Sequence, residues 1–378
     1  MGHKKPNELT PTEFENGKFS EPKTVAAGIP AVFSAVRHLL DEMDPVRATK
    51  VMFELNQKGG VDCPGCAWPD PDGKRSSLGE YCENGAKAIA EEATTKGLDS
   101  RFFQENSIDD LASQTDYWIG KRGRILQPVI LEEGANHYQP ITWDNAFNLI
   151  ANELNALPSP DDAVFYTSGR TSNEAAFMYQ LFVRMFGTNN LPDCSNMCHE
   201  SSGVALSETV GIGKGSVTLD DFNEAEVILV IGQNPGTNHP RMLSALKKAK
   251  LRGAKIITIN PLPEAGIIKF KDPQSVSDVM GGGVSLTDLF LQVRINGDVP
   301  RMKAILKRLL ELERKSPGSV FDQAFIESKT AGYQDLCDDL DRYHFSNLCE
   351  ESGVQQAEVE AAVNLLANTD KIIACWAM

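Results

Sequence analysis

The sequence predicts an α/β fold built around a parallel sheet, and three observations support this. Residues 226–232 (EVILVIG) form an unbroken apolar run typical of a buried strand. A loop and a helix with Pro240 in its first turn separate this run from a second strand at 256–260 (IITIN). A β-α-β crossover of this kind implies parallel strands with helices on both faces of the sheet. The apolar run at 371–378 predicts one more buried strand.

The first third of the chain is expected to be rich in loops. Residues 1–23 read as a polar lead-in, and residues 31–43 (AVFSAVRHLLDEM) form an apolar, helix-like run. Between Gly59 and Gly79, Gly, Pro, Asp and Cys dominate, and no helical or strand period is sustained. Such a segment needs something other than its own core to hold it in place.

Regular elements begin near residue 140. Thr142 is an expected cap of a helix whose apolar positions recur at helical spacing. Thr171 and Glu174 have the spacing of a capping box for a second helix, which stops near Gly187. The apolar run 163–167 (AVFYT) between them predicts a strand. Further helices are expected at 302–314 and 355–368.

Length and composition exclude several classes of protein. A chain of 378 residues is expected to form two or three domains, and 41% hydrophobic and 24% charged residues are typical of a soluble globular protein. The net charge of −15, without a Lys/Arg stripe, argues against a nucleic-acid partner. No apolar run reaches the roughly 18–20 residues of a membrane span, and no secretory signal is visible. We therefore expect a cytoplasmic protein whose eight cysteines are buried thiols or metal ligands rather than disulfides.

A cysteine-containing loop is the first candidate site. Cys63-Pro64-Gly65-Cys66 is a C-x-x-C motif, and Cys82 follows downstream. The turn between the first two cysteines can direct both thiolates at one metal, so an iron–sulfur cluster, a structural zinc ion and redox or structural thiols all stay open. An iron–sulfur cluster normally uses four thiolates, and only three cysteines are near. Asp70 lies about where a further ligand is expected, and a turn residue in a Pro-Asp-Pro run explains it equally well.

A second candidate is Cys198-His199, within residues 196–203 (NMCHESSG). A thiolate binds a soft or high-valent metal well, and an adjacent imidazole can accept a proton beside it. On the residues alone, an inert buried thiol and an ordinary histidine stay open as alternatives.

The loop 232–239 (GQNPGTNH) is the third candidate, because backbone N–H groups between a strand and a helix favour phosphate. The loop is not a G-x-G-x-x-G fingerprint, and Asn260-Pro261 rather than an acidic residue closes the second strand. These departures argue against an ordinary NAD-dependent dehydrogenase.

Several segments together carry a family resemblance. Residues 196–246 match best, with support from 168–174 (SGRTSNE), 187–190 (GTNN) and 253–257 (GAKII). Residues 60–68 (GVDCPGCAW) and 81–87 (YCENGAK) resemble an amino-terminal cluster region. In these segments the chain resembles molybdopterin oxidoreductases, in particular formate-dehydrogenase-like alpha subunits. The resemblance implies a small iron–sulfur-type domain followed by the Rossmann-like, parallel-sheet α/β domains of the DMSO reductase-like fold.

The resemblance also implies cofactors and residue roles. The cofactors are molybdenum bis(molybdopterin guanine dinucleotide) and a [4Fe–4S] cluster. Cys198 matches the cysteine or selenocysteine that coordinates molybdenum, and His199 matches a neighbouring histidine thought to help proton transfer. The cysteines at cluster positions are Cys63, Cys66 and Cys82. The positions matching the cofactor-binding regions are Ser168, Arg170, Asn173, Asn234, Pro235, Thr237, Asn238, His239, Asn260, Pro261 and Lys87.

Two departures from the family pattern bear on electron transfer. The third family cysteine is missing, with Asp70 near its place, and Asn84 stands where a lysine usually links cluster and pterin, although Lys87 is close. The family's chains continue well beyond Met378, so we expect an N-terminal portion of a longer enzyme. The expected divisions are a cysteine-loop domain at 1–135, the first part of an α/β cofactor domain at 136–195, and a second α/β cofactor domain at 196–378.

These inferences predict the N-terminal part of a molybdenum-dependent oxidoreductase that takes two electrons from a small-molecule substrate and passes them to an iron–sulfur cluster. Formate is the substrate expected by analogy. Arg170 and Arg241 are available for its carboxylate, and pairing with cofactor phosphates or surface acids explains both arginines equally well. The electron-accepting protein or subunit is not specified by the sequence. Two alternatives stay open: a truncated, non-catalytic α/β binding or scaffold protein without cofactor, and a zinc-stabilised NAD-binding protein, which the missing fingerprint disfavours.

Overall fold

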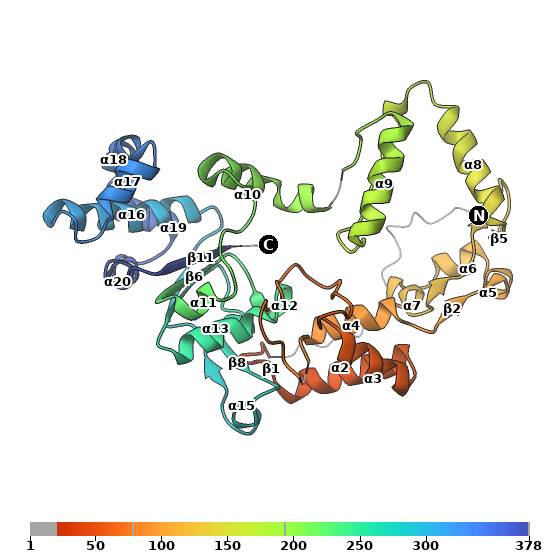
Figure 1. The fold of residues 1–378 in the computed structure, drawn as a ribbon, viewed down its shortest axis with the longest axis horizontal. Coiled ribbons are helices and arrows are strands. Elements are labelled where there is room, and N and C mark those ends of the chain that lie inside the picture. The colour runs from red at the N-terminus through yellow and green to blue at the C-terminus, as the bar shows by residue number, and fades with distance from the viewer. Residues whose placement is uncertain (1–20, 78, 193, 377–378) are drawn as a thin grey trace. The chain divides into compact units, whose positions relative to one another are not determined.

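The computed structural model describes residues 21–77, 79–192 and 194–376, with the backbone alone for 194–198. These residues fall into two compact units (Figure 1). Unit 1 contains Ser34–Gly65 and Gly85–Gly213, and unit 2 contains Pro22–Phe33, Cys66–Asn84 and Lys214–Met378. The boundaries expected from the sequence, at 135 and 195, stay a prediction.

Unit 2 is built on a four-stranded sheet in the order β10-β7-β6-β11, in which every neighbouring pair is parallel. Helix α13 (Met242–Leu251) crosses from β6 to β7, so the predicted β-α-β crossover is confirmed. The strand expected near the end of the sequence is also confirmed, as β11, which pairs with β6. The strands are β6 (Val227–Ile231), β7 (Lys255–Asn260), β10 (Leu289–Gln292) and β11 (Ile372–Trp376).

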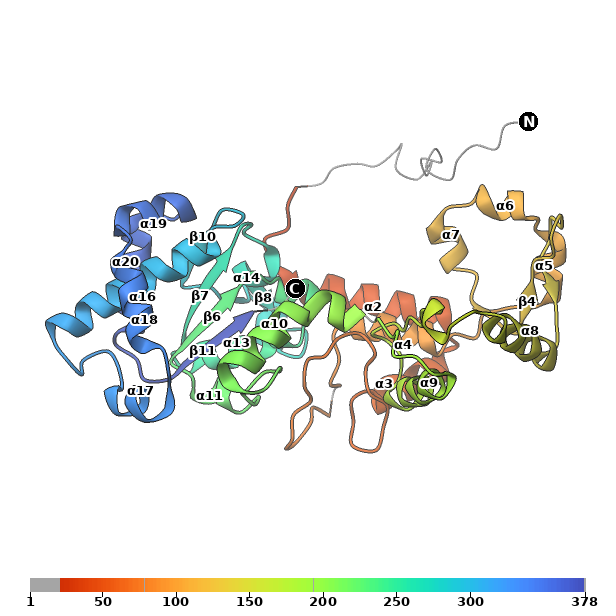
Figure 2. The same ribbon diagram turned by 90° about the horizontal axis from the view of Figure 1, so that it is seen from above.

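The apolar run of β6 exists because both faces of the sheet are covered. Val227 and Leu229 point into one core, and Ile228 and Val230 point into the other. The first core is closed by α16 (Asp298–Lys315), α19 (Phe345–Ser352) and α20 (Gln356–Leu366), and the second by α13 and α11 (Asp221–Glu224). Figure 2 shows α16 and α20 on one side of the sheet and α13 on the other.

The helices expected at 302–314 and 355–368 are confirmed as α16 and α20. Unit 2 also contains a three-stranded sheet in the order β1-β8-β9 and several short helices. These remaining elements are β1 (Ala26–Ala27), β8 (Lys269–Lys271), β9 (Val284–Ser285), α12 (Pro235–Asn238), α14 (Ala265–Ile268), α15 (Val276–Met280), α17 (Gln323–Lys329) and α18 (Tyr333–Asp341).

Unit 1 is mainly helical, with two small two-stranded sheets, β2-β3 and β4-β5. Helices α2 and α4 begin in unit 2 and continue into unit 1. The elements are α2 (Gly28–Glu42), α3 (Pro45–Glu54), α4 (Glu83–Glu92), β2 (Gly97–Leu98), α5 (Ser100–Glu105), α6 (Ile108–Ala112), α7 (Asp116–Gly120), β3 (Arg124–Ile125), β4 (Val129–Ile130), β5 (Gln139–Pro140), α8 (Trp143–Asn155), η2 (Pro160–Asp162), α9 (Asn173–Phe186) and α10 (Cys194–Val210).

Sequence signals in unit 1 are partly confirmed. Thr142 caps α8 by accepting a hydrogen bond from the Asn145 backbone N–H at 3.2 Å. Helix α9 is capped by Ser172 rather than Thr171, and it ends at Gly187 with φ 112°. The strand predicted at 163–167 is wrong: this run forms no strand ladder, because a strand requires a neighbour to complete its backbone hydrogen bonds.

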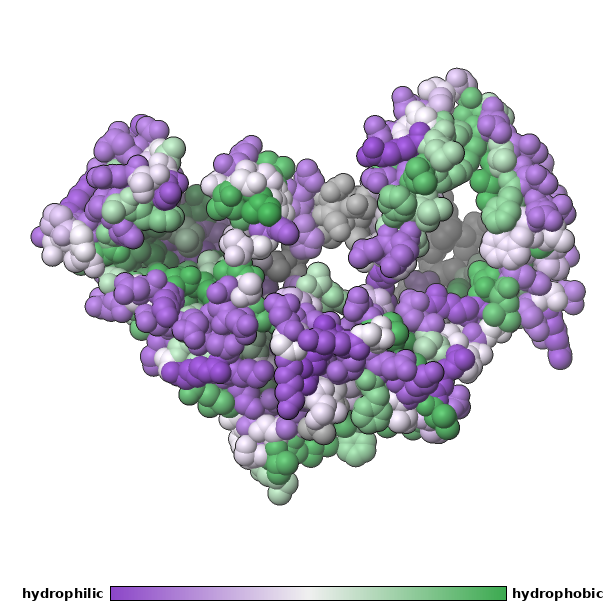
Figure 3. Space-filling model, in the orientation of Figure 1, coloured by the Kyte–Doolittle hydropathy of each residue, from purple (hydrophilic) through white to green (hydrophobic). Residues whose placement is uncertain are grey.

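Helices α8 and α9 expose large apolar side chains. Trp143 on α8 is 61% exposed, and Phe177 on α9 is 63% exposed. Apolar surface is visible over both helices in Figure 3. Across the part of the chain that the structure describes, no helix is both long enough and apolar enough to cross a membrane.

Candidate functional site

The order of the strands in unit 2 identifies one end of β6 as the expected place for a ligand. From β6 the chain proceeds to β7 and β10 on one side, whereas β11 pairs on the other side. In open parallel sheets, ligands bind beyond the carboxyl ends of the strands where the direction of winding reverses. That switch point lies between β6 and β11, where Ile231 pairs with Trp376. The loop 232–239 begins here.

The loop 232–239 contains the short helix α12, with Pro235 at its first position. Helix α13 begins at Met242, just after the start expected at Pro240, and Pro240 lies in the turn that leads into it, where its carbonyl accepts from the Leu243 N–H at 3.2 Å. The loop is tied to the neighbouring strand through the Gly232 N–H, which donates to the Ile259 carbonyl at 2.8 Å.

Two glycines bring α12 against α14. A Cβ atom added to Gly236 would lie 2.7 Å from Cα of Gly266, and one added to Gly266 would lie 2.6 Å from Cα of Gly236. Only glycine at both positions permits this backbone contact. The loops after β6 and β7 are thereby joined into one surface, which contains Asn234, Pro235, Thr237, Asn238, His239, Asn260 and Pro261. Gly266 was not singled out by sequence reasoning, since no local signal reports a close approach of two distant backbones.

Two acceptor atoms on this surface are buried without a hydrogen-bond partner among the described residues: Oδ1 of Asn234 and Oε2 of Glu264. A buried acceptor without a donor is costly, so such atoms point to a missing donor. Asn260 is buried, and its amide nitrogen donates to the Leu262 carbonyl at 2.8 Å. Sequence reasoning missed Glu264, which sits in an ordinary-looking Pro-Leu-Pro-Glu loop.

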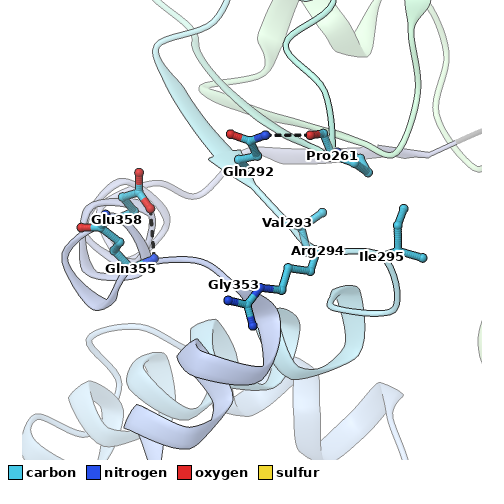
Figure 4. A pocket seen from close by; sticks show the side chains of 8 residues that line it. All are labelled: Pro261, Gln292, Val293, Arg294, Ile295, Gly353, Gln355 and Glu358. Atoms are coloured by element: carbon cyan, nitrogen blue, oxygen red, sulfur yellow. Dashed lines mark hydrogen bonds between the residues drawn. The ribbon is translucent and has the colours of Figure 1, made fainter.

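An open pocket of about 500 Å³ lies at the same edge of the sheet, at the ends of β7 and β10 (Figure 4). Gln292, the last residue of β10, donates from its amide to the Pro261 carbonyl at 2.9 Å. Gly353 (φ 78°) packs against the Arg294 side chain, and a Cβ there would approach that side chain to 2.5 Å. The lining residues are Pro261, Gln292, Val293, Arg294, Ile295, Gly353, Gln355 and Glu358.

The thiols of Cys63, Cys66 and Cys82 are all partly exposed and form no disulfide. The backbone of Cys63 is held by the side chain of Asn56, whose Oδ1 accepts from the Cys63 N–H at 2.8 Å. Among the described residues, no group of three His, Cys, Asp or Glu side chains is close enough to hold a metal ion. Metal ligation by the three cysteines stays a prediction.

Residues 124–272 match the sequence model of molybdopterin oxidoreductases. This range includes the loop 232–239, Asn260 and Cys198-His199. The chain belongs to the molybdopterin oxidoreductase family. The resemblance seen in the sequence motifs is confirmed.

Curated relatives extend this match. An uncharacterised oxidoreductase of Mycobacterium tuberculosis is 50% identical over 94% of this chain and 46% of its own length. The protein YdeP of Escherichia coli is 40% identical over 93% of this chain and 47% of its own length. The alpha subunit of an F420-dependent formate dehydrogenase of Methanococcus maripaludis is 25% identical over 77% of this chain and 40% of its own length. The chain thus spans about half the length of the curated relatives it matches, or less.

A solved structure supports the fold. Acetylene hydratase from Pelobacter acetylenicus superposes with a TM-score of 0.50 and 20% identity, over 65% of this chain and 30% of that protein. The parallel-sheet α/β fold of the molybdopterin oxidoreductase family, expected from the sequence, is confirmed. At 20% identity, the similarity to acetylene hydratase supports a shared fold and not a shared reaction.

The remaining family positions lie in unit 1. Cys198 belongs to α10, but its side chain lies outside the described residues, and His199 beside it is exposed. Ser168, Arg170 and Asn173 are exposed at the start of α9, and Nη1 of Arg170 lies 3.8 Å from a Glu91 carboxylate oxygen. Half-buried Lys87 lies on α4.

Proposed function

We propose that this chain carries a cofactor-binding part of a molybdenum-dependent oxidoreductase acting on a small molecule, with formate as the first candidate substrate. The observation that carries the proposal is the loop 232–239, which begins at the switch point of a parallel sheet in a chain of the molybdopterin oxidoreductase family. When bound, a molybdenum pterin centre accepts two electrons from the substrate.

The residues around the switch point fit one guanine dinucleotide of the proposed bis(molybdopterin guanine dinucleotide). Asn234 and Glu264 each present a buried acceptor without a donor, as needed for hydroxyl and N–H groups of a nucleotide. The Gly236–Gly266 contact fixes the loop after β6 against the loop after β7, so the backbone N–H groups at the start of α12 are held in place for phosphate. The adjoining pocket beside Arg294 offers a cationic side chain and further room.

Roles for Cys198 and His199 in this proposal are supported by the sequence resemblance. Cys198 would supply the thiolate ligand of molybdenum, and a ring nitrogen of His199 would take the substrate proton. Replacing Cys198 with Ser should abolish substrate-dependent dye reduction by the full-length enzyme, and full activity would remove this assignment. Dye reduction that is absent with formate at every pH tested, but present with another small molecule, would remove formate alone.

An iron–sulfur cluster of the [4Fe–4S] type on Cys63, Cys66 and Cys82 is part of the proposal, as electron acceptor from molybdenum. Three thiolates are one short of the usual set. Asp70, the residue nearest to the missing position, is engaged in ion pairs. Three of the usual four thiolates are therefore available in the sequence, and among the described residues they do not lie close enough together to hold a metal without rearrangement. Cytoplasmic location also stays a prediction.

The test of cofactor binding measures molybdenum, and GMP released by acid hydrolysis, in chain purified anaerobically from a host that makes the cofactor. We expect both to copurify with the wild type. Gly236→Ala and Asn234→Ala should lower both at least tenfold, because they disturb the loop at the switch point. Gly215→Ala is the matched control, since a Cβ there meets nothing within 4 Å.

Absence of molybdenum and GMP from a wild-type chain with native circular dichroism would contradict the proposal. That outcome would favour the second candidate, a non-catalytic α/β binding or scaffold protein, which the exposed apolar faces of α8 and α9 also suit.

A further inference from the structure

Residues 66–82, which we call the cysteine segment, are fastened to unit 2 by polar contacts. Among its described residues the segment contains no helix or strand. Its main apolar contact is Trp68, whose ring lies 5.7 Å from that of Phe222 and 6.4 Å from that of His239. One indole cannot fix a segment of this length, so other contacts must supply the order.

Arg241 supplies the first of these contacts. Nη1 of Arg241 lies 2.6 Å from Oδ1 of Asp70, and Nη2 lies 2.9 Å from Oε2 of Glu80. The guanidinium therefore joins two points of the cysteine segment that are ten residues apart. The three side chains are only 13%, 19% and 15% exposed, respectively. Charge-assisted hydrogen bonds that are largely shielded from water are much stronger than surface pairs.

Both oxygens of Asp70 are engaged. Oδ1 accepts from Arg241, and Oδ2 lies 3.4 Å from Nη1 of Arg75. A carboxylate between two guanidinium groups could ligate a metal only by giving up these pairs. The two cations would also repel a metal ion approaching it.

Gln274 supplies a second anchor. Its Oε1 accepts from the Ser76 hydroxyl at 2.9 Å, and its Nε2 donates to the Gly79 carbonyl at 2.7 Å. The loop that bears Gln274 is itself held by Lys247, which lies 2.6 Å from Asp278. Burial alone would lower the pKa of Lys247, but hydrogen bonds to Asp278 and its neighbours outweigh this and raise the pKa. Lys247 therefore keeps its charge at neutral pH.

The cysteine segment is thus placed against the loop of the proposed nucleotide site. Only Pro240 separates Arg241 from this loop, and just beyond the segment the Asn84 amide donates to the Thr237 carbonyl at 2.7 Å. We propose that Arg241 is a positioning residue, which locks the cysteine segment to the loop 232–239 without any metal and commits Asp70 to the ion pair. Any metal bound by the segment then meets cysteine thiolates and not Asp70. The statement about metal rests on the proposed function, whereas the attachment of the segment by Arg241 does not.

Trypsin tests the lock in chain freed of metal by a chelator, because Lys74 and Arg75 are cleavage sites inside the segment. We expect Arg241→Met to speed cleavage there about tenfold, which corresponds to about 1.4 kcal/mol of opening free energy. The cleavage rate of Arg241→Lys should fall between those of the wild type and Arg241→Met. Lysine keeps the positive charge, but it cannot bind two carboxylates through a planar guanidinium group. Arg314→Met is the matched control: Arg314 also pairs bidentately with a carboxylate, Asp341, but outside the segment.

Asp70→Asn distinguishes an ion-pair partner from a metal ligand. As a partner of Arg241, Asp70→Asn should speed cleavage of the metal-free chain, and the increase in the double variant with Arg241→Met should be smaller than the product of the two single increases, because the two residues share one ion pair. A residue that only ligates metal would leave the metal-free rate unchanged. Equal cleavage of wild type and Arg241→Met, with native circular dichroism in both, would overturn the lock.

Iron content separates this inference from the proposed function. After anaerobic reconstitution, Asp70→Asn should bind as much iron as the wild type, whereas Cys66→Ser should lose it. Iron loss in Asp70→Asn as large as in Cys66→Ser would overturn the exclusion of Asp70. If the wild type binds no iron, the proposed cluster fails, while the trypsin rates still decide the role of Arg241 and its pairing with Asp70.

Discussion

Unit 1 and unit 2 bury their apolar residues to very different degrees. Strands β6 and β7 of unit 2 point almost every side chain into one of two continuous cores. Helix α8 of unit 1 has no buried residue at all, and α9 has Val183 alone. The parallel sheet is therefore stabilised by its own packing, whereas α8 and α9 gain little from contacts within unit 1.

Two isoleucines test this comparison most directly. Ile257 on β7 is fully buried, and Ile150 on α8 is 54% exposed. We expect Ile257→Ala to lower the free energy of unfolding by about 2–5 kcal/mol, through lost burial and the cavity left behind. Ile150→Ala should change it by less than about 0.5 kcal/mol. Urea denaturation followed by circular dichroism measures both, and equal losses would show that the two units are equally dependent on packing.

Arg301 is a charged residue inside the better packed unit, so it tests whether that packing tolerates a buried charge. The side chain is fully buried; Nη2 lies 3.1 Å from Asp298, while Nε and Nη1 have no partner among the described residues. Burial lowers the pKa of Arg301. Arg301→Met should raise the free energy of unfolding by about 1–4 kcal/mol, since an apolar chain of similar length removes an unsatisfied buried charge. A loss of stability in the same urea titration would show that the charge has a stabilising partner.

Glu313 is also a buried charged residue of unit 2, but, unlike Arg301, its charged group has hydrogen-bond partners for both oxygens. It accepts from the backbone N–H groups of Gly318, Val320 and Phe321 and from the amide of Gln323. These hydrogen bonds, that from Gly318 foremost, lower the pKa of Glu313 to about 2. The folded pKa is below the unfolded value, so the stabilisation is complete above about pH 4.5 and is lost as the pH falls towards 2.

Glu313→Gln replaces one acceptor by a donor that faces other donors, so it should lower the melting temperature at pH 7. The difference from the wild type should shrink as the pH falls from about 4.5 to 2. Melting curves across this range measure it, with Glu327→Gln as a control on an exposed carboxylate in the same unit. A difference that is independent of pH would contradict the assignment of this titration to Glu313.

The degree of burial also decided which strands could be predicted from the sequence. Strands β6 and β7 were predictable because burial on both faces leaves an unbroken apolar run. Strand β11 was predictable from its apolar run too, although Ile372, Ala374 and Trp376 are exposed. The run 163–167 has a similar composition, but Val164 and Tyr166 are exposed, and only its other face, with Phe165, is buried against α9. An apolar run indicates that a segment must be buried. Whether a neighbouring strand is there to pair with it depends on the tertiary fold.

The candidate site shows the same limit. The loop 232–239 was predictable, since a loop between a strand and a helix is a local signal. The contact of Gly236 with Gly266 and the pairing of Asp70 with Arg241 join distant parts of the sequence. From spacing alone, Asp70 could be a metal ligand or a turn residue, and neither expectation named its ion pair.

The pairing of β11 with β6 has a consequence for the order in which the protein is made. During synthesis β6 and β7 emerge well before β11, although β11 forms one side of the switch point. Until Trp376 has left the ribosome, one edge of β6 has unpaired backbone groups and can join the strand of another chain. Docking of β11 therefore completes the backbone hydrogen bonds on this edge of β6, and the place where the loop 232–239 begins is complete only after it has docked.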